Sequence, residues 1–299
     1  MNISKEFLEA ASREIRVPST LSDLEAVKKV VGAAIVQVAR RNHRLDPRAI
    51  DIYMHGSYAN NTNIYFPSNL EVVVEFKILR QPVYRLFNDY WVETREEFTP
   101  RDFTMQLLDE LREIIGADIE HHGQVIILPP SKDRKHTVEI TPAFTFTHTT
   151  GDGEFKGILV WDEGVEAHLA TFPRIHQRNG EMQDKITRGN FLRMTRAFKT
   201  LNAIAAREGH GVKVRGYFIQ CLLFNVPRNL YASDDLQTVF YSIFNYLMRA
   251  DIRGFASQNL VWSLFGIAPE FWSLDDAHDY IKALKKYERK WPPERTELI

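Results

Sequence analysis

The stretch between residues 53 and 76 constrains the fold of this chain more strongly than any other part of it. Apolar residues at positions 50, 52 and 54 predict a short strand that runs into Gly56 and Ser57. After a polar turn rich in asparagine, residues 70–76 alternate between an apolar face and a face with acidic side chains. The pattern therefore predicts a sheet whose first two strands are connected through a Gly-Ser turn and a polar loop.

Oxygen-bearing side chains lie at the start of the second predicted strand. Because strand residues alternate between the two faces, Asn69 and Glu71 share one face and lie next to each other. The backbone N–H groups and the hydroxyl of Gly56 and Ser57 suit a phosphate group, and paired oxygen ligands suit Mg²⁺. These residues predict the layout of a nucleotidyl-transfer site, which still needs a third carboxylate and several cations.

A second strand-like run offers a candidate for the third carboxylate. Residues 137–142 alternate like a strand, with Glu139 between Val138 and Ile140. An acid in a core strand is costly to bury without a partner, so a strand next to residues 70–76 would bring Glu139 to Glu71. An edge strand with Glu139 in water explains the same pattern equally well.

Cationic side chains gather in a predicted helix that begins at Thr187 and ends at Gly209. Lys185 leads into it, and Lys199 is expected on its outward side. Three arginines share the helix, at positions 188, 193 and 196. Lysines act as point charges on polyphosphates, but a row of cations on a helix is more often a solvated face. From the helical pattern alone, the solvated face is the favoured interpretation.

Composition limits the class of protein. The chain has 299 residues, of which 44% are hydrophobic and 26% charged, as in soluble globular proteins. A net charge of −1 provides no global attraction to nucleic acid or to anionic membranes. Cys221 is the only cysteine and lies in an apolar run, which predicts a buried structural thiol. The charged N-terminus lacks the apolar region of a signal peptide, so a cytoplasmic location is expected.

The order of predicted elements indicates an α+β fold with two lobes. Strands and helices alternate up to residue 163, and only helices are expected from Gly164 onward. We therefore expect a lobe over residues 1–163, a helical lobe over 164–299 and an active site in the cleft between them. The other predicted elements are helices over 22–42, capped by Ser22 and Glu25, over 100–115 and over 217–226, helix starts at 233 and 273, and strands over 124–128 and 136–140.

Two further patterns have ordinary structural interpretations. Adjacent strand residues point to opposite faces, so His121 and His122 are not expected to bind one metal ion. The aromatic residues between positions 240 and 246 fall in a helical stretch, where packing in the core is their expected role.

Taken in order, these motifs resemble the DNA polymerase beta-like nucleotidyltransferase superfamily. Its signature is Gly-[Gly/Ser], a spacer, Asp-h-[Asp/Glu]-h and a later h-[Asp/Glu]-h, where h is apolar. Within it the chain resembles the bacterial CD-NTases, relatives of cyclic GMP-AMP synthase. The matching segments are GSYANNTNI (56–64), NLEVVVEF (69–76), VEITPAF (138–144), Trp161, DKITRGNFLRMTRAFKTL (184–201) and GYFIQCLLFNVP (216–227).

The resemblance implies a polymerase beta-like fold and an activity. It implies a nucleotidyltransferase that makes a cyclic or linear oligonucleotide second messenger from NTPs in CBASS-like anti-phage defence. The implied cofactor is Mg²⁺, with Mn²⁺ as the alternative, and the implied partners are the NTPs and a nucleotide-activated effector protein encoded nearby. The implied roles are Gly56 and Ser57 on the donor triphosphate, Asn69, Glu71 and Glu139 as catalytic metal ligands, Lys185 and Lys199 on the triphosphate, and Tyr217 stacked on the donor base.

The chain departs from the family pattern at the site itself. Asn69 stands where the family has the first acid, and an amide oxygen lacks the charge from which Mg²⁺ draws much of its affinity. Gly216 replaces the serine usual before the stacking aromatic, and Gln220 replaces an acid. Two alternatives therefore stay open. One is a catalytically impaired nucleotide sensor or scaffold, and the other is a templateless polymerase that extends a bound 3′ end and needs a basic groove.

Overall fold

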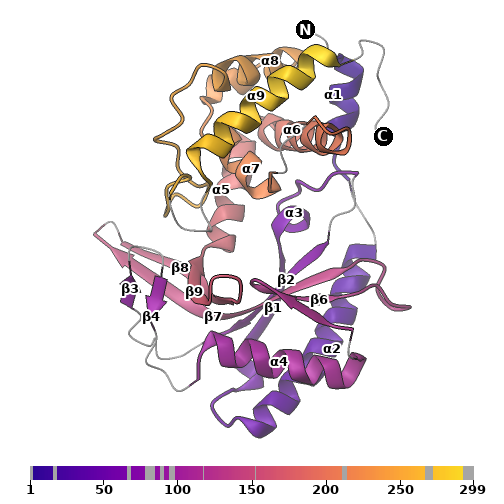
Figure 1. The fold of residues 1–299 in the computed structure, drawn as a ribbon, viewed down its shortest axis with the longest axis vertical. Helices are drawn as coiled ribbons and strands as arrows, with labels where there is room; N and C mark the ends of the chain where they lie inside the picture. The colour runs from indigo at the N-terminus through magenta and orange to yellow at the C-terminus, as the bar shows by residue number, and fades with distance from the viewer. Residues whose placement is uncertain are drawn as a thin grey trace. The chain divides into compact units, whose positions relative to one another are not determined.

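The structure is a computed structural model that describes residues 3–15, 19–65, 69–77, 85–87, 91–93, 98–116, 118–151, 153–210, 214–266 and 272–291. Figure 1 shows its elements in chain order. They are α1 (Lys5–Ala11), α2 (Ser19–Arg41), η1 (Pro47–Ala49), β1 (Ile50–His55), α3 (Gly56–Ala59), β2 (Leu70–Phe76), β3 (Arg85–Phe87), β4 (Trp91–Glu93), α4 (Pro100–Ile115), β5 (Glu120–His122), β6 (Val125–Leu128), β7 (Val138–Thr150), β8 (Gly153–Asp162), β9 (Ala167–Thr171), α5 (Pro173–Ile186), α6 (Asn190–Arg207), α7 (Gly216–Phe224), η2 (Arg228–Tyr231), α8 (Leu236–Leu247) and α9 (Leu274–Lys290).

The described residues form two compact units. One, the sheet unit, comprises Arg16–Tyr58 and Ser68–Ile175, and the other, the helical unit, comprises Met1–Ile15, Ala59–Pro67 and His176–Ile299. The boundary predicted between residues 163 and 164 differs from the change of units at Ile175 and His176, and residues 1–15 and 59–67, expected in the first lobe, belong to the helical unit. The active-site cleft expected between two lobes stays a prediction.

The sheet unit is built on one mixed sheet. Its strand order is β1-β2-β7-β8-β9-β4-β3, with β6 paired to β7 and β5 to β6. Strands β2 and β7 run parallel, whereas β1 is antiparallel to β2 and β8 is antiparallel to β7. Because the parallel strands begin at the same end of the sheet, their first residues lie side by side.

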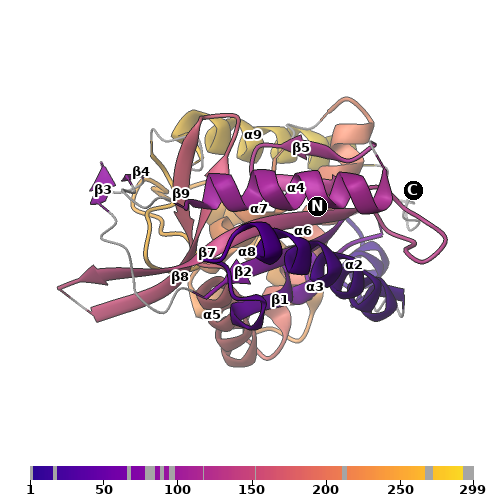
Figure 2. The same cartoon turned by 90° about the horizontal axis from the view of Figure 1, so that it is seen from below.

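Helices α2 and α4 cover one face of this sheet (Figure 2). Strand β2 buries Leu70, Val72 and Val74 against Val31 of α2 and Leu107 of α4. The acidic residues of β2 point to the other face, which confirms the alternation predicted from the sequence. The apolar face therefore anchors β2 in a fixed register, and this register determines where its acidic side chains lie.

Helix α4 begins and ends as the sequence predicts. Thr99 and Asp102 form a reciprocal capping box, and Pro100 occupies the first turn. The helix ends at Gly116, whose φ of +130° is a conformation that side chains rarely adopt. Local chemistry is thus sufficient to define this element.

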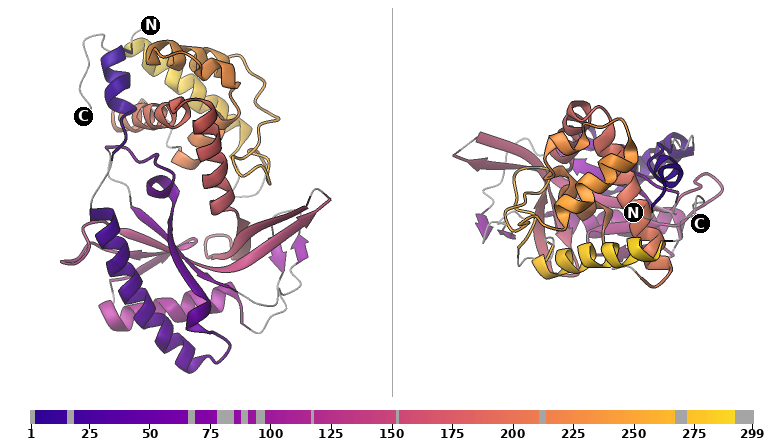
Figure 3. Two further views of the ribbon diagram at one scale, coloured as in Figure 1. Left: turned by 180° about the vertical axis from the view of Figure 1, so that it is seen from behind. Right: turned by 90° about the horizontal axis from the view of Figure 1, so that it is seen from above.

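The helical unit has a core of its own. Helix α1 lies beside α6 and α8 (Figure 3) and buries Phe7 and Leu8 with Phe198 and Phe240. This packing explains why the first residues of the chain belong to the helical unit. Cys221 is fully buried in the same core, which confirms the predicted structural thiol. In the described part of the chain, no helix has the length and apolar character needed to cross a membrane.

Two expectations about the middle of the chain are wrong. Strand β9 follows Gly164, so this region is not purely helical; it pairs with β8 and buries Leu169. The helix expected from Thr187 to Gly209 is α6, but it begins three residues later, at Asn190, because Arg188 and Gly189 take left-handed conformations with φ of +54° and +87° and separate it from α5. Lys185 therefore lies in the last turn of α5 rather than before a single long helix.

The start of α2 also differs from the sequence prediction. The helix begins at Ser19, so Ser22 lies inside it and is not the predicted N-cap. Thr20 and Leu24 are both buried, and this packing extends the helix by about one turn towards the N-terminus. Asp23 then accepts hydrogen bonds from the backbone N–H groups of Lys135 and His136, at 3.1 and 3.0 Å.

Candidate functional site

Three polar residues meet on neighbouring strands of the sheet unit. The antiparallel pairing of β1 and β2 sets His55 opposite Glu71, and the parallel pairing of β2 and β7 sets Glu71 opposite Glu139. At Glu139, strand β7 has β2 on one side and β6 on the other, where Ile127 is the paired residue, so the alternative of an edge strand for Glu139 is wrong. The two carboxylates therefore belong to directly adjacent strands on one face of the sheet.

The Gly-Ser turn holds one of these carboxylates. The backbone N–H of Ser57 donates a hydrogen bond to Oε2 of Glu71 at 3.0 Å. Gly56 has a φ of +68°, and a Cβ at this position would lie only 1.6 Å from Oε2 of Glu71. The left-handed backbone conformation favours glycine here, and a side chain at this position would displace the carboxylate of Glu71. The turn is thus built around Glu71.

Asn69 contacts the other carboxylate. Its Nδ2 donates a hydrogen bond to Oε1 of Glu139 at 2.6 Å, across the gap between β2 and β7. Asn69 precedes β2 and lies on the same face as Glu71, as the strand period predicts. The three oxygen-bearing residues predicted from sequence are thus brought together by the tertiary structure.

His55 is a member of this cluster that sequence reasoning missed, although it directly precedes Gly56. Its Nε2 is buried and, among the described residues, has no hydrogen-bond partner. Burial lowers the pKa of His55 to about 4, although the charge of Glu139 acts in the opposite direction. The imidazole is therefore neutral at neutral pH and adds no positive charge beside the carboxylates.

The donor set of this cluster fits a hard divalent cation. Two carboxylates and one amide oxygen are the ligand types that Mg²⁺ takes, together with water and phosphate oxygens. In the part of the chain that the structure describes, no three His, Cys, Asp or Glu side chains group into a metal site. Glu71, Glu139 and Asn69 are the residues that would hold the ion.

Two basic residues of α6 hold the segment that follows the Gly-Ser turn. Nζ of Lys199 donates to the carbonyl oxygen of Thr62 at 2.6 Å. The guanidinium of Arg196, which is buried, donates to the carbonyl oxygens of Asn61 and Ser12, at 2.6 and 2.8 Å. The solvated cationic face favoured by the helical pattern is therefore wrong for these two residues, because the protein uses their charges to organise backbone carbonyls.

Gly216 gives Lys199 the room that this contact needs. A Cβ at Gly216 would lie 2.7 Å from Cε of Lys199 and 3.1 Å from its Nζ. The tip of Lys199 thus lies in the space that a side chain at position 216 would take. Lys185, in contrast, is exposed at the end of α5.

Tyr217 presents an aromatic surface in the helical unit. Its ring stacks on His176, with centroids 5.0 Å apart and planes 28° apart, yet 38% of the residue stays exposed. Burial of the hydroxyl near Cys221 raises the pKa of Tyr217 well above its usual value. The hydroxyl is thus fixed inward while the ring stays accessible, as a platform for a planar ligand requires.

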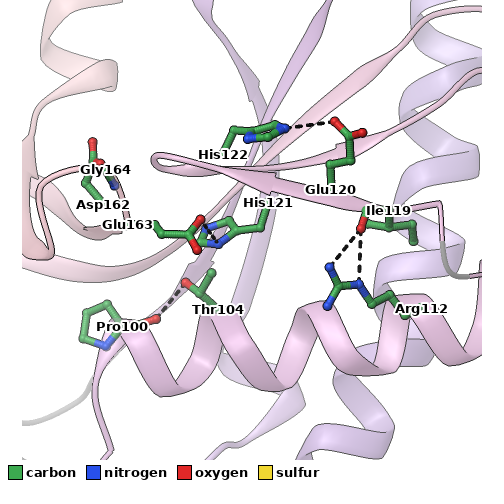
Figure 4. Close-up of polar contacts among 10 residues, drawn as sticks. All are labelled: Pro100, Thr104, Arg112, Ile119, Glu120, His121, His122, Asp162, Glu163 and Gly164. Atoms are coloured by element: carbon green, nitrogen blue, oxygen red, sulfur yellow. Dashed lines mark hydrogen bonds and ion pairs between the residues drawn. The ribbon is translucent and has the colours of Figure 1, made fainter.

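The two histidines of β5 have different partners. Figure 4 shows His121 and His122 pointing to different partners. Nδ1 of His121 lies 3.1 Å from Glu163, and Nε2 of His122 lies 2.9 Å from Glu120. The expectation that adjacent strand residues diverge is confirmed.

Comparison with known proteins identifies relatives along most of the chain. Residues 178–289 match the model of the cGAS/DncV-like nucleotidyltransferase C-terminal helical domain. The cyclic nucleotide synthase CdnE01 of Staphylococcus haemolyticus is 26% identical over 286 residues, which cover 89% of this chain and 92% of the relative. The cyclic UMP-AMP synthase of Rhodothermus marinus is 25% identical over 254 residues, or 81% of this chain and 85% of the relative.

Solved structures match the fold over nearly the whole chain. The Rhodothermus marinus CdnE c-UMP-AMP synthase with Apcpp and Upnpp superposes with a TM-score of 0.75 at 22% identity, covering 97% of each chain. The Elizabethkingia meningoseptica CdnE cyclic dinucleotide synthase with GTP and Apcpp has a TM-score of 0.77 at 20% identity, covering 96% of this chain and 99% of that one. The predicted α+β, polymerase beta-like fold is confirmed.

Proposed function

We propose that the chain is a member of the CD-NTase family, as its motifs implied, and that it joins NTPs into a cyclic or linear oligonucleotide second messenger. The observation that carries the proposal is the register of β1, β2 and β7. It sets Glu71 and Glu139 side by side at the Gly-Ser turn. Relatives over most of the chain are named cyclic nucleotide synthases, which supports the same activity here.

The proposed reaction is a nucleotidyl transfer. A ribose hydroxyl of the acceptor nucleotide attacks the α-phosphate of the donor, a new phosphodiester bond forms, and the bond to the β-phosphate breaks to release pyrophosphate. Glu139 accepts the proton of the attacking hydroxyl. The backbone of Gly56 and the hydroxyl of Ser57 bind the donor triphosphate, and Ser57 also keeps Glu71 in place through its N–H.

Divalent cations fit this proposal. Glu71, Glu139 and Asn69 would hold Mg²⁺ or Mn²⁺, which when bound neutralises charge on the triphosphate and lowers the pKa of the attacking hydroxyl. Since Asn69 is neutral, the protein contributes two negative charges rather than three. In the helical unit, Lys185 and Lys199 supply positive charge for the triphosphate, and Lys199 is already positioned by Thr62.

Tyr217 is expected to stack on the donor base. Replacing it by alanine removes the ring, and a stacking contact worth about 1–3 kcal/mol predicts a rise in KM for the donor NTP of about 5- to 150-fold. Tyr217→Phe keeps the ring and removes only the inward hydroxyl, so its KM should stay within about threefold of the unmodified protein. Initial rates over a range of NTP concentrations measure both. Equal KM values for the two variants would contradict a stacking role.

The test of the proposed function is a product assay. The purified protein is incubated with each labelled NTP and dNTP, singly and in pairs, with MgCl₂ or MnCl₂, and the products are treated with phosphatase and separated. A phosphatase-resistant product supports synthesis, and its identification distinguishes cyclic from linear forms. The absence of any such product from both the unmodified protein and Asn69→Asp would overturn the proposal.

Asn69 specifically favours a second candidate, a catalytically impaired nucleotide sensor or scaffold. In that case the site keeps its NTP but lacks one charge needed for transfer. Product from Asn69→Asp alone would identify this candidate. For either candidate we propose a role in bacterial anti-phage defence in the cytoplasm, with an effector protein that responds to the nucleotide.

A further inference from the structure

The hydrogen bond between Asn69 and Glu139 has a consequence for how the site acquires its metal. We infer that the Asn69 amide takes the place of a cation in the free protein, so that the divalent ion binds together with the nucleotide and not before it. This inference rests on the proposed NTP-binding role of the site and adds the order of binding.

The contacts of the two carboxylates show why the free site is stable without an ion. Adjacent strands are about 4.8 Å apart, so the paired residues Glu71 and Glu139 hold two like charges close together. The N–H of Ser57 donates to Glu71, and Nδ2 of Asn69 donates to Glu139 at 2.6 Å. Each carboxylate therefore has a hydrogen-bond donor that stabilises its charge.

The hydrogen bond from Asn69 to Glu139 opposes metal binding. The amide of Asn69 directs its N–H group at Glu139, whereas a metal ligand must direct its oxygen at the ion. The amide therefore has to turn and release Glu139 before the full ligand set is available. Only two negative charges then face the ion, and affinity for hard cations falls with the number of charged ligands.

A bound triphosphate compensates for the missing negative charge at position 69, because it carries several negative charges and its oxygens are themselves ligands. With aspartate at position 69, three carboxylates would converge on the site. They would repel one another without an ion and bind it readily when it is present. The amide thus makes the free protein stable without metal and makes metal binding depend on the nucleotide.

The first test measures metal binding without nucleotide. Mn²⁺ is titrated into the protein and its free concentration is followed by electron paramagnetic resonance. We expect Asn69→Asp to bind Mn²⁺ at least about tenfold more tightly than the unmodified chain. Asn42→Asp, which adds the same charge at the end of α2 and keeps the oxygen that accepts from Arg44, should bind no better than the unmodified chain. Equal Mn²⁺ affinity of Asn69→Asp and the unmodified chain would overturn the inference.

The second test measures thermal unfolding. In EDTA, Asn69→Asp and Asn69→Ala should both unfold a few degrees below the unmodified chain, because both lose the donor to Glu139. Added Mn²⁺ should restore only Asn69→Asp, which distinguishes charge from general damage. An unchanged midpoint of Asn69→Asp in EDTA would contradict the role assigned to the amide.

The third test addresses the order of binding and keeps it separate from synthesis. The α,β-methylene analogues of ATP, GTP, CTP and UTP are added one at a time, with and without Mn²⁺. The midpoint of the unmodified chain should rise with an analogue and Mn²⁺ together and not with Mn²⁺ alone. A rise with Mn²⁺ alone would overturn the inference, whereas no rise with any analogue in any variant would count against the proposed NTP binding itself.

Discussion

Replacing Glu71 by glutamine is expected to abolish nucleotide transfer, with a fall in rate of about a thousandfold or more. The loss of one carboxylate from a site that already has an amide at position 69 leaves Glu139 as its single negative ligand. Several kcal/mol of charge stabilisation in the transition state corresponds to a rate factor of this size. The glutamine oxygen can still accept from the N–H of Ser57, so the fold should be kept. The product assay and thermal unfolding measure the two effects separately.

Glu75 provides a matched control for this experiment. It lies on the same face of β2 as Glu71, about 13 Å further along the strand, and contacts Thr145 and Arg174. Glu75→Gln makes the same chemical change in the same strand, yet synthesis should stay within about threefold of the unmodified chain. A loss of synthesis in Glu75→Gln equal to that in Glu71→Gln would mean that the charge of the strand, and not the site, is responsible.

Replacing Gly56 by alanine is expected to lower synthesis by at least about a hundredfold and to destabilise the chain. The left-handed backbone costs a residue with a side chain about 1–2 kcal/mol. In addition, the new Cβ would lie 1.6 Å from Oε2 of Glu71, so the carboxylate or the turn has to move. A displacement of about 1 Å in a catalytic group can cost about a hundredfold in rate. Rates and unfolding midpoints of the purified variant check both effects.

Gly209 provides a control that distinguishes the strain of a left-handed backbone from the displacement of Glu71. Its φ of +72° matches that of Gly56, but no atom lies within 4 Å of the position that its Cβ would take. Gly209→Ala should therefore show the backbone cost of about 1–2 kcal/mol in unfolding and keep nearly full synthesis. If Gly56→Ala kept synthesis to the same extent, the close approach to Glu71 would not be essential for catalysis.

Much of the fold followed from local sequence patterns. The alternation of residues 70–76, the helix that starts at Pro100 and ends before Gly116, and the Gly-Ser turn each depend on neighbours in the chain, and the structure has them as predicted. Elements that depend on distant packing were missed or misplaced. Strand β9 is defined by its pairing with β8, and the early start of α2 by the burial of Thr20 and Leu24.

The candidate site also combines features that local spacing predicts with features that depend on long-range pairing. Asn69 and Glu71 could be assigned to one face because the strand period is a property of the chain itself. Whether Glu139 joined them depended on which strand lies beside β2, and a single sequence does not specify the pairing of strands far apart in the chain. The burial of Arg196 and its hydrogen bonds could not be predicted either, because its partners Ser12 and Asn61 are distant in sequence.

By itself, the sequence determined the residue types of the site, the faces on which they lie and the family to which they point, since these follow from local spacing and motif order. Only the tertiary structure decided that Glu71 and Glu139 are direct neighbours, that Gly56 is in contact with the first carboxylate and that Asn69 is bonded to the second. The physical reason is that such contacts are set by long-range strand register and by packing of the apolar face of the sheet.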